Sequence, residues 1–466
     1  MENNYDEENT VEIHYEKYLE NLNNKENNEL EEKSEIENKD YKFDNNDELE
    51  EKEAIIVNGS NKPKKKKNKT KIIIIIISIL ILLAGIGIGL YFLLTPAHKE
   101  ANEIDNKKEC EKFKYHWWND KNICIENQTV EQINNEKDND YKKAECLEFN
   151  YYWWGKKNTC SKTEPKLEIV DEKSTTRPIA VMINNHAQAR PYHSGLQDAN
   201  IVYEIIVEGG ITRMMAIFKD KTTARIGSVR SSRHYYLDYA LENDAIYVHF
   251  GWSPQAENDI RQLKVNNING LYDSGFERDL SLPVDYEHTA ITSIDKITTT
   301  ANSKGYRMNY NSENVYDEQV LKYSTDEIDL SGSEDSMIAN SVIIPYSYYM
   351  TSSYKYDPEH KYYLRFANDV AHTDYVTKEQ YHFKNIIVIN VKNYSIDNYG
   401  RQTLDNIGTG TGYFITNGYA RPITWEKSSR ESKTIYKYQD GTEINVNDDN
   451  TFIQIEPITQ TATISE

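Results

Sequence analysis

An uncharged, apolar segment constrains this chain more than any other feature of its sequence. Ile72 to Leu94 reads IIIIIISILILLAGIGIGLYFLL, 23 residues without a charged side chain. As a helix it would be roughly 34 Å long at 1.5 Å per residue, enough to cross a bilayer. A helix buried in a globular core would be shorter and less uniformly apolar. The sequence therefore predicts one transmembrane helix over residues 72–94.

The charges on the two sides of this segment indicate its orientation. Seven lysines lie between Lys62 and Lys71, and residues 95–98 (TPAH) follow the segment. Because basic residues are retained on the cytoplasmic side, residues 1–71 are expected inside the cell. Everything from about residue 95 onward is then expected outside.

The first 60 residues are strongly acidic. They hold 20 Asp and Glu against 6 Lys, a net charge of −14 (6 minus 20). Such a segment buries too little apolar surface to offset its ordering entropy, so we expect a disordered cytoplasmic tail over residues 1–61 and a basic juxtamembrane run over 62–71. The whole chain carries −21, so its acidic exterior gives no support for a nucleic-acid partner.

The four cysteines lie in a duplicated motif just after the apolar segment. CEKFKYHWWNDKNIC (110–124) and CLEFNYYWWGKKNTC (146–160) share eight of fifteen positions at an offset of 36 residues. Paired cysteines outside a cell usually oxidise. Equal spacing favours Cys110–Cys124 and Cys146–Cys160, although four cysteines allow three connectivities. The spacing lacks the close ligand pairs of zinc modules, so no metal site is expected.

Each repeat contains two adjacent tryptophans, Trp117-Trp118 and Trp153-Trp154, which must point to opposite faces of a strand. One interpretation is a miniature core, because a short disulfide-closed hairpin needs large aromatics to hold its shape. The other is a surface on which a glycan stacks. In both cases residues 95–165 would serve partly as an extracytoplasmic stalk.

Gly209-Gly210 separates two apolar runs in YEIIVEGGITRMMAIF (203–218), the pattern of a tight hairpin. A two-residue loop would place Glu204 and Glu208 on one face with Arg213 diagonal to both. That face is either a structural ion-pair network buried under a helix or part of a ligand cleft. In the cleft, Arg190, Arg230 and Arg233 would supply positive charge for a carboxylate or phosphate group.

The region from Arg177 alternates strand and helix patterns, which indicates an α/β layered domain. RPIAVMINN and AIYVHF are predicted strands. RSSRHYYLDYALEND is a predicted helix capped near Ser231 or Ser232, with Tyr236, Tyr239 and Ala240 facing inward. SPQAENDIRQL predicts a second helix with Ser253 as N-cap and Pro254 in its first turn.

The segment from about Met337 is rich in predicted strands, including SVIIPYS, YKYDPEHKYYLRFA and NIIVINV, and Asn417-Gly418 predicts a hairpin turn. Gly408, Gly410 and Gly412 lack the strand–loop–helix context of a phosphate-binding loop, so they predict a run of β-turns.

These motifs carry a family resemblance. RPIAVMINN, ARPYHSGLQDANIVYE, VEGGITRMMAIF, IGSVRSSRHYYLD and HFGWSPQA occur in the order found in the YerB-like lipoprotein family, and the later HTDYVT and GTGTGYFITNGYARPITW resemble its C-terminal domain. The resemblance implies a membrane-tethered extracytoplasmic protein. Its expected fold class is α/β (α+β): a three-layer sandwich-like first outer domain over 166–330, then a strand-rich domain over 336–466.

Two departures from the family pattern stand out. Its members are usually anchored by a lipidated cysteine near the N-terminus, whereas no cysteine here precedes Cys110. The family commonly shows Pro-His-Asn where this chain has Glu287-His288-Thr289.

Polar residues that could form a site gather in the first outer domain, but no nucleophile elbow, HExxH or P-loop is present. A thiol nucleophile is excluded there because all four cysteines precede it. Ser231 or Ser253 could act with His249, although helix capping explains both serines. The candidates are Arg190, Glu204, Glu208, Arg213, Arg230, Ser231, Arg233, His249, Ser253, Arg278 and His288.

Glu204 and Glu208 suit a hydrolase poorly. Four residues along a strand span about 13 Å, whereas glycosidase carboxyl groups lie roughly 5–9.5 Å apart. We therefore expect an envelope protein that binds a cell-wall glycan, an anionic polymer or another envelope protein, with no cofactor. The alternatives are a wall-modifying hydrolase and a transmembrane scaffold or sensor.

Overall fold

The computed structural model describes residues 99–311 and 319–466. The predicted acidic tail, basic run and transmembrane helix lie outside these residues. Within the two described ranges, no helix is long and apolar enough to cross a membrane.

Each Cys/Trp repeat folds as a helical segment followed by a β-hairpin. The first contains η1 (Ala101–Glu103), α3 (Lys107–Lys112), β1 (His116–Trp118) and β2 (Ile123–Ile125). The second contains α4 (Val130–Asn134), α5 (Asn139–Glu148), β3 (Tyr152–Trp154), η2 (Gly155–Lys157) and β4 (Thr159–Ser161). Disulfides Cys110–Cys124 and Cys146–Cys160 join a helix to the last strand of each unit, which confirms the predicted pairing.

The tryptophans of the repeats pack within and between the units. Trp117 and Trp153, at equivalent positions, contact the small core around the disulfide of their own repeat. Trp118 is 2% exposed, because Tyr141 of the second repeat lies 5.6 Å away between ring centroids. Trp154 is half-buried, with the Lys157 ammonium 3.8 Å from its ring. The miniature cores and the contact between repeats thus use both faces of the strands.

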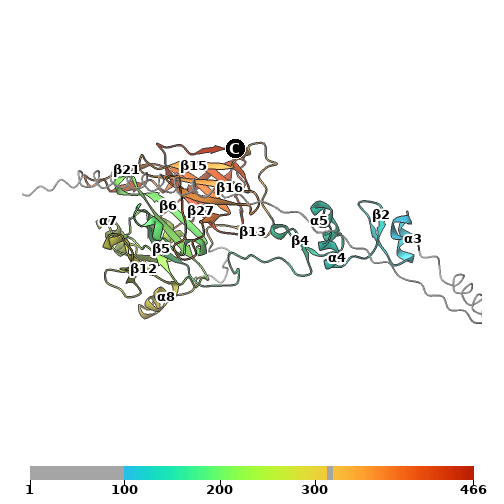
Figure 1. Ribbon diagram of the computed structural model, residues 1–466, viewed down its shortest axis with the longest axis horizontal. Helices are drawn as coiled ribbons and strands as arrows, with labels where there is room; N and C mark the ends of the chain where they lie inside the picture. The colour runs from blue at the N-terminus through green and yellow to red at the C-terminus, as the bar shows by residue number, and fades with distance from the viewer. Residues whose placement is uncertain (1–98, 312–318) are drawn as a thin grey trace, which may run out of the picture. The chain divides into compact units, whose positions relative to one another are not determined.

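The two regions predicted as domains, 166–330 and 336–466, are called the outer segments below. Strands from both form one sheet, in the order β10-β9-β5-β7-β6-β27-β20-β23-β24-β14, with β25 also paired to β24. The bounds are β5 Ile179–Asn184, β6 Ile201–Ile206, β7 Thr212–Phe218, β9 Ile246–His249, β10 Asn267–Asn269, β14 Met337–Ile338, β20 Asn385–Val391, β23 Gly408–Thr416, β24 Tyr419–Lys427, β25 Ile435–Tyr438 and β27 Thr451–Pro457. Parallel pairing of β6 with β27 joins the two segments, as Figure 1 shows.

The direction of the strands defines one edge of this sheet. β5, β9 and β10 are parallel, and so are β6, β27 and β20, whereas β7 is antiparallel to both β5 and β6. Both parallel groups therefore run the same way. The loops that follow β5, β6, β9 and β10 all lie at this carboxyl edge, where β7 begins.

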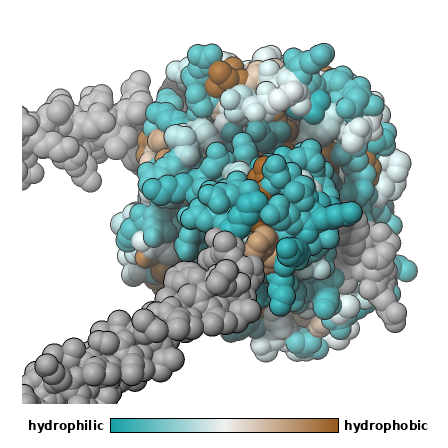
Figure 2. All heavy atoms as spheres, turned by 90° about the vertical axis from the view of Figure 1, so that its right-hand side faces the viewer, coloured by the Kyte–Doolittle hydropathy of each residue, from teal (hydrophilic) through white to brown (hydrophobic). Residues whose placement is uncertain are grey.

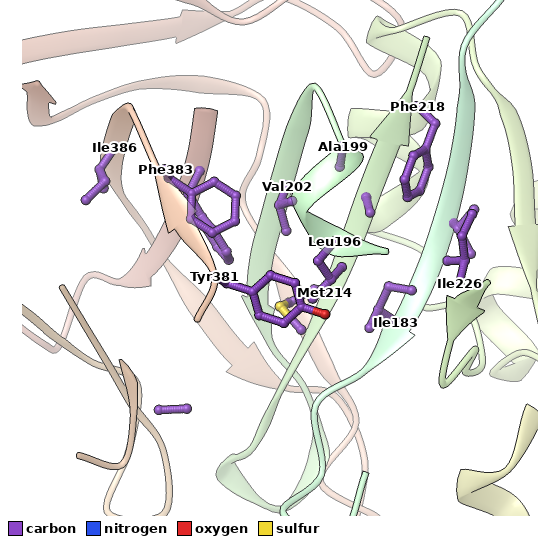
Figure 3. Close-up of a cluster of buried hydrophobic side chains, with 14 of the residues drawn as sticks. Ile183, Leu196, Ala199, Val202, Met214, Phe218, Ile226, Tyr381, Phe383 and Ile386 are labelled. Carbon is purple, nitrogen blue, oxygen red and sulfur yellow. The ribbon is translucent and has the colours of Figure 1, made fainter. Parts of the chain in front are cut away.

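The sheet is buried on both faces. Every residue of β5, β6, β7 and β27 is buried, the pattern of strands covered on two sides. On one face, Val202, Met214 and Leu196 pack with Tyr381 and Phe383 of the C-terminal segment (Figure 3). The two outer segments therefore share a hydrophobic core.

Different elements cover the two faces. The face around Tyr203 packs against α6 (Tyr236–Glu242) and α7 (Pro254–Gln262). The face around Val202 packs against α8 (Ile294–Ser303) and a six-stranded sheet. That sheet contains β15 Ser341–Pro345, β16 Thr351–Asp357, β17 Tyr362–Ala367, β18 Val370–Ala371, β19 His382–Phe383 and β28 Thr463–Ser465. The mixed α/β first part and the strand-rich C-terminal part agree with the predicted class.

Smaller elements complete the described fold. Three short sheets hold β8 Ile226–Gly227, β11 Glu277–Arg278 and β12 Ala290–Thr292; β13 Tyr323–Ser324 and β26 Val446–Asn447; and β21 Asn393–Ser395 and β22 Gln402–Leu404. Single 3-10 turns are η3 Arg190–Tyr192, η4 Leu196–Asp198, η5 Glu208–Gly210 and η6 Tyr286–His288. The face drawn in Figure 2 is mostly hydrophilic, with its hydrophobic residues scattered.

Several local predictions are confirmed. Ser253 caps α7 by accepting the Ala256 N–H at 3.2 Å, and Pro254 opens that helix. Tyr236, Tyr239 and Ala240 of α6 are buried. Asn417 and Gly418 join β23 to β24 with φ of 51° and 81°, as a primed hairpin turn requires.

Two local predictions are wrong. α6 begins after Tyr235 without a side-chain cap, rather than at Ser231 or Ser232. Gly408, Gly410 and Gly412 lie in strand β23 rather than in turns. A Cβ at Gly412 would lie 2.0 Å from the Val388 carbonyl oxygen, and one at Gly410 would lie 2.4 Å from the Trp425 indole nitrogen. These glycines make room for a neighbouring backbone and a large ring.

The predicted register of the β6–β7 hairpin is wrong by one residue. Ile206 pairs with Thr212, and Ile205 pairs with Arg213, because the loop has three residues (208–210) closed by the Val207 N–H to Ile211 carbonyl bond. A shift of one residue moves a side chain to the other face. Arg213 therefore lies on the face of Tyr203 and Ile205, opposite Glu204, and does not bridge the two glutamates.

Peptide mapping without reductant should recover the linkages Cys110–Cys124 and Cys146–Cys160. Each bond closes a 15-residue loop, which stabilises by about 3 kcal/mol in the chain-entropy model. Reduction should therefore lower the denaturant concentration at which the two repeats unfold. The large sheet contains no cysteine, so its unfolding midpoint should not change. Peptides that link one repeat to the other would contradict this pairing.

Candidate functional site

Glu204 lies at the centre of a buried polar network. Arg365 on β17 donates from Nη2 to Glu204 Oε2 at 2.8 Å, and both residues are fully buried. The two residues are 161 positions apart, one in each outer segment. This ion pair lies between the large sheet and the six-stranded sheet, so of the two predicted alternatives Glu204 belongs to a buried network, but one covered by a sheet rather than by a helix.

The Glu204 carboxylate is saturated with donors. Oε1 accepts hydrogen bonds from Asn185 Nδ2 (2.9 Å) and Thr212 Oγ1 (2.6 Å). Oε2 accepts from Ser352 Oγ (2.8 Å) and Gln454 Nε2 (3.1 Å) as well as from Arg365. A carboxylate held by five donors and closed to solvent suits a structural role rather than proton transfer to a substrate.

Two histidines extend the network from Arg365. Arg365 Nη1 donates to His372 Nδ1 at 2.6 Å, and His372 Nε2 lies 2.9 Å from His193 Nδ1. His193 Nε2 in turn contacts the carbonyl oxygen of Asn184 at the end of β5. Because Arg365 can only donate, His372 accepts at Nδ1 and donates from Nε2 to His193 Nδ1, and His193 donates from Nε2 to the carbonyl oxygen. Each ring therefore carries one proton and is neutral. Burial and the nearby Arg365 lower the pKa of His372, and burial lowers the pKa of His193 to about 3.

Glu208 and two arginines, Arg230 and Arg233, lie at the carboxyl edge of the sheet. Arg233 holds Glu208 through two hydrogen bonds of 2.6 and 2.8 Å. Although burial opposes ionisation, Arg233 lowers the pKa of Glu208 below its ordinary value. Arg230 bonds to the carbonyl oxygen and carboxylate of Glu287. Both ion pairs keep some exposure to solvent.

Arg213 is a buried arginine without a carboxylate at ion-pair distance among the described residues. It is 8% exposed, and Nη1 donates to the Ser231 carbonyl oxygen at 2.7 Å. Burial lowers its pKa to about 9; the positive charge of Arg233 adds to this shift, and the nearby Glu208 carboxylate opposes it. An incompletely compensated guanidinium in this position favours an anion as its partner.

Two histidines, His186 and His288, lie close to these arginines. The rings of His186 and His288 stack at 4.7 Å, and Asn184 Nδ2 donates to His288 Nδ1 at 2.7 Å. Burial and the charges of Arg190 and Arg230 lower the pKa of His186. Burial, His186 and Arg230 lower that of His288 to about 4. Both rings are neutral near pH 7, where they serve as hydrogen-bonding groups.

We call Arg190, Arg213, Arg230, Arg233, His186 and His288 the arginine cluster. Three carboxylates lie near it, those of Glu208, Asp285 and Glu287. Four guanidinium groups thus face three carboxylates in a chain whose net charge is −21. The cluster is built from the segment after β5 (His186 and Arg190), from the start of β7, from the segment before α6 and from η6, which carries His288. Carboxyl edges of parallel strands are a frequent place for ligands in open sheets.

The other predicted site residues lie apart from this chemistry. His249 is fully buried, with Nδ1 2.8 Å from the Gly251 carbonyl oxygen, and burial lowers its pKa to about 4. Ser253 caps α7, and Ser231 contributes only its carbonyl oxygen to Arg213. Arg278 lies over the rings of Phe250 and Tyr286 at 4.5 and 4.0 Å. No serine–histidine pair results.

The sequence analysis missed His186, His193, Arg365 and His372. His193 stands in ARPYHSG, one of the motifs that carry the family resemblance, but nothing in the local sequence indicates its contact with His372. Within residues 99–311 and 319–466, no group of three His, Cys, Asp or Glu side chains is placed to hold a metal ion.

Comparison with known proteins assigns the family. The description "Protein of unknown function (DUF3048) N-terminal domain" matches residues 166–307, and the C-terminal domain of the same family matches 342–453. "Putative lipoprotein YerB" of Bacillus subtilis (strain 168) is 32% identical over 299 residues, which cover 62% of this chain and 84% of that protein. The chain belongs to the DUF3048 family. The resemblance predicted from the motifs is thereby confirmed.

A solved relative supports the architecture. The crystal structure of the YerB protein from Bacillus subtilis matches with a TM-score of 0.54 and 30% identity, over 64% of this chain and 97% of that one. Both family models begin after Cys160, so the Cys/Trp repeats lie outside the regions that match the family.

Replacing Glu204 by Gln should lower the free energy of unfolding by about 3–5 kcal/mol, because Arg365 would remain charged and buried without its partner. Glu456→Gln is the matched control. Burial raises the pKa of Glu456 to about 7, so near pH 6 its carboxyl is largely protonated and glutamine replaces it with little change. Denaturant unfolding of both variants at pH 6 checks this, and equal losses would contradict the structural role of the pair.

Acid should destabilise the fold through His193 and His372. Their folded pKa values lie below the ordinary value near 6.5, so the unfolded chain binds protons that the folded chain excludes. The contribution of these histidines to the free energy of unfolding is therefore fully present above pH 6.5. It is lost as the pH falls, by about 1.4 kcal/mol per pH unit for each histidine. Unfolding measured from pH 7 to 4.5 tests this. His193→Asn should reduce the slope, whereas His360→Asn should not reduce it, because the hydrogen bond to Asp357 raises the pKa of His360.

Proposed function

We propose that this chain is a membrane-held envelope protein whose outer part binds an anionic ligand at the arginine cluster. The observation that carries the proposal is Arg213, buried at the carboxyl edge with the Ser231 carbonyl oxygen as its hydrogen-bond partner. Arg230 and Arg233 lie close to it, and Arg190 lies close to His186 of the same cluster. An anion would complete the charge balance of the cluster, and forked guanidinium donors match phosphate and carboxylate oxygens.

Phosphate fits this cluster better than a carboxylate does. A carboxylate has two oxygens and is filled by one guanidinium fork, whereas a terminal phosphate offers three oxygens and up to two negative charges. Several arginines with two neutral histidines suit the larger acceptor. The ligand class that we propose is therefore a phosphate-bearing component of the cell envelope.

The location rests on separate evidence. The uncharged 72–94 segment with seven lysines before it supports a single span with residues from about 95 outside. Two disulfides fit an oxidising compartment. The relative carries the description "Putative lipoprotein YerB", which also supports attachment to a membrane. A hydrolase function has less support, because Glu204 is closed to solvent and saturated with donors.

Calorimetric titration of the full-length protein with inorganic phosphate tests the proposal. Wild-type protein should bind phosphate more tightly than acetate, and Arg213→Gln should weaken phosphate binding at least tenfold, a change of about 1.4 kcal/mol. Arg421→Gln is the charge-matched control, because Arg421 pairs with Asp335 on the far part of the large sheet. Absence of phosphate binding, or equal binding by Arg213→Gln, would overturn the proposal.

A further inference from the structure

Two aromatic side chains stand beside the arginine cluster at the same edge of the sheet. Trp252 lies three residues after the end of β9, and Tyr272 lies three residues after the end of β10. Their ring centroids are 5.9 Å apart. Trp252 is half-buried, whereas Tyr272 is 75% exposed. We call this pair the aromatic platform.

A buried asparagine holds the two loops of the platform together. Asn269 is 2% exposed, and its Oδ1 accepts the N–H of Gly251 at 2.9 Å and the N–H of Leu271 at 3.1 Å. Each of these residues directly precedes one of the platform aromatics. The His249 ring also packs against Trp252, with 5.4 Å between the two ring centroids. The platform is therefore a preorganised surface rather than two independent exposed rings.

The platform is continuous with the arginine cluster through the backbone. Trp252 forms a parallel bridge with Ser232, and the Phe250 N–H donates to the Arg230 carbonyl oxygen at 2.9 Å. Ser232 lies between Ser231, which binds Arg213, and Arg233, which binds Glu208. Neighbouring strands lie about 4.8 Å apart, so the backbone segments that carry the aromatic and the charged groups are adjacent.

Charge and ring surface together define one kind of ligand. Aromatic rings pair an apolar face with a polar edge, which suits the mixed surface of a sugar ring. Ligand sites commonly combine an aromatic lining with a few oriented polar groups. Resting on the proposed function, we infer that the ligand is a phosphorylated saccharide, with its phosphate on the arginine cluster and its sugar ring on the aromatic platform.

Titration with two probes separates this inference from the proposed function. Full-length protein is titrated with inorganic phosphate and with glucose 1-phosphate, and glucose 1-phosphate should bind about tenfold more tightly. Tyr272→Ala should abolish this difference while phosphate binding is retained. Because Tyr272 is mostly exposed, this variant should fold. Tyr399→Ala, which removes a 79% exposed tyrosine in the β21–β22 turn, is the control.

Each outcome decides one of the two claims. Equal affinity of wild-type protein for both probes would overturn the saccharide inference and leave the anion site in place. Tighter binding of glucose 1-phosphate that persists in both Tyr272→Ala and Trp252→Leu would overturn the placement of the sugar on the platform. Failure to bind inorganic phosphate would instead overturn the proposed function itself.

Discussion

The Glu204–Arg365 ion pair is the interaction on which the arrangement of the two outer segments depends. Either charge alone would be strongly unfavourable in this interior, and each becomes tolerable only when the other segment is in place. Asn185, Thr212 and Ser352 converge on the same carboxylate, so the end of β5 and the starts of β7 and β16 are fixed relative to one another. Apolar packing holds the two segments together, and the ion pair determines in which arrangement they pack.

The same region determines what lies at the carboxyl edge. His193 links Arg365 and His372 to the Asn184 backbone, and the next residues of the chain lead to His186 and Arg190. Glu208 and Arg213, at the loop end of the hairpin, lie close to Arg233. Arg230 is also close to Arg213. The closed network therefore borders a charged rim, the arginine cluster, whose ion pairs Arg233–Glu208 and Arg230–Glu287 keep some exposure to solvent.

This arrangement explains why acids and arginines occupy a well-packed hairpin. Glu204 is structural and has its partner in the C-terminal segment, whereas Glu208 belongs to the rim and is held by Arg233. Arg213 lies on the other face from Glu204 and contributes charge to the rim. The structural-network interpretation therefore applies to Glu204, and the ligand-cleft interpretation is what we propose for the residues of the rim.

The sequence by itself determined features that depend on nearby residues. Equal spacing within a repeat predicted the disulfides, Ser253-Pro254 predicted the start of α7, and Asn417-Gly418 predicted a turn, because these signals act over a few residues. The order of motifs also identified the family. Only the tertiary structure decided the partner of Glu204, because Arg365 is 161 residues away and no local pattern marks it. It also decided the face of Arg213: a three-residue loop and a two-residue loop fit the same Gly-Gly signal, and since side chains alternate along a strand, that one residue moves the charge from one side of the sheet to the other.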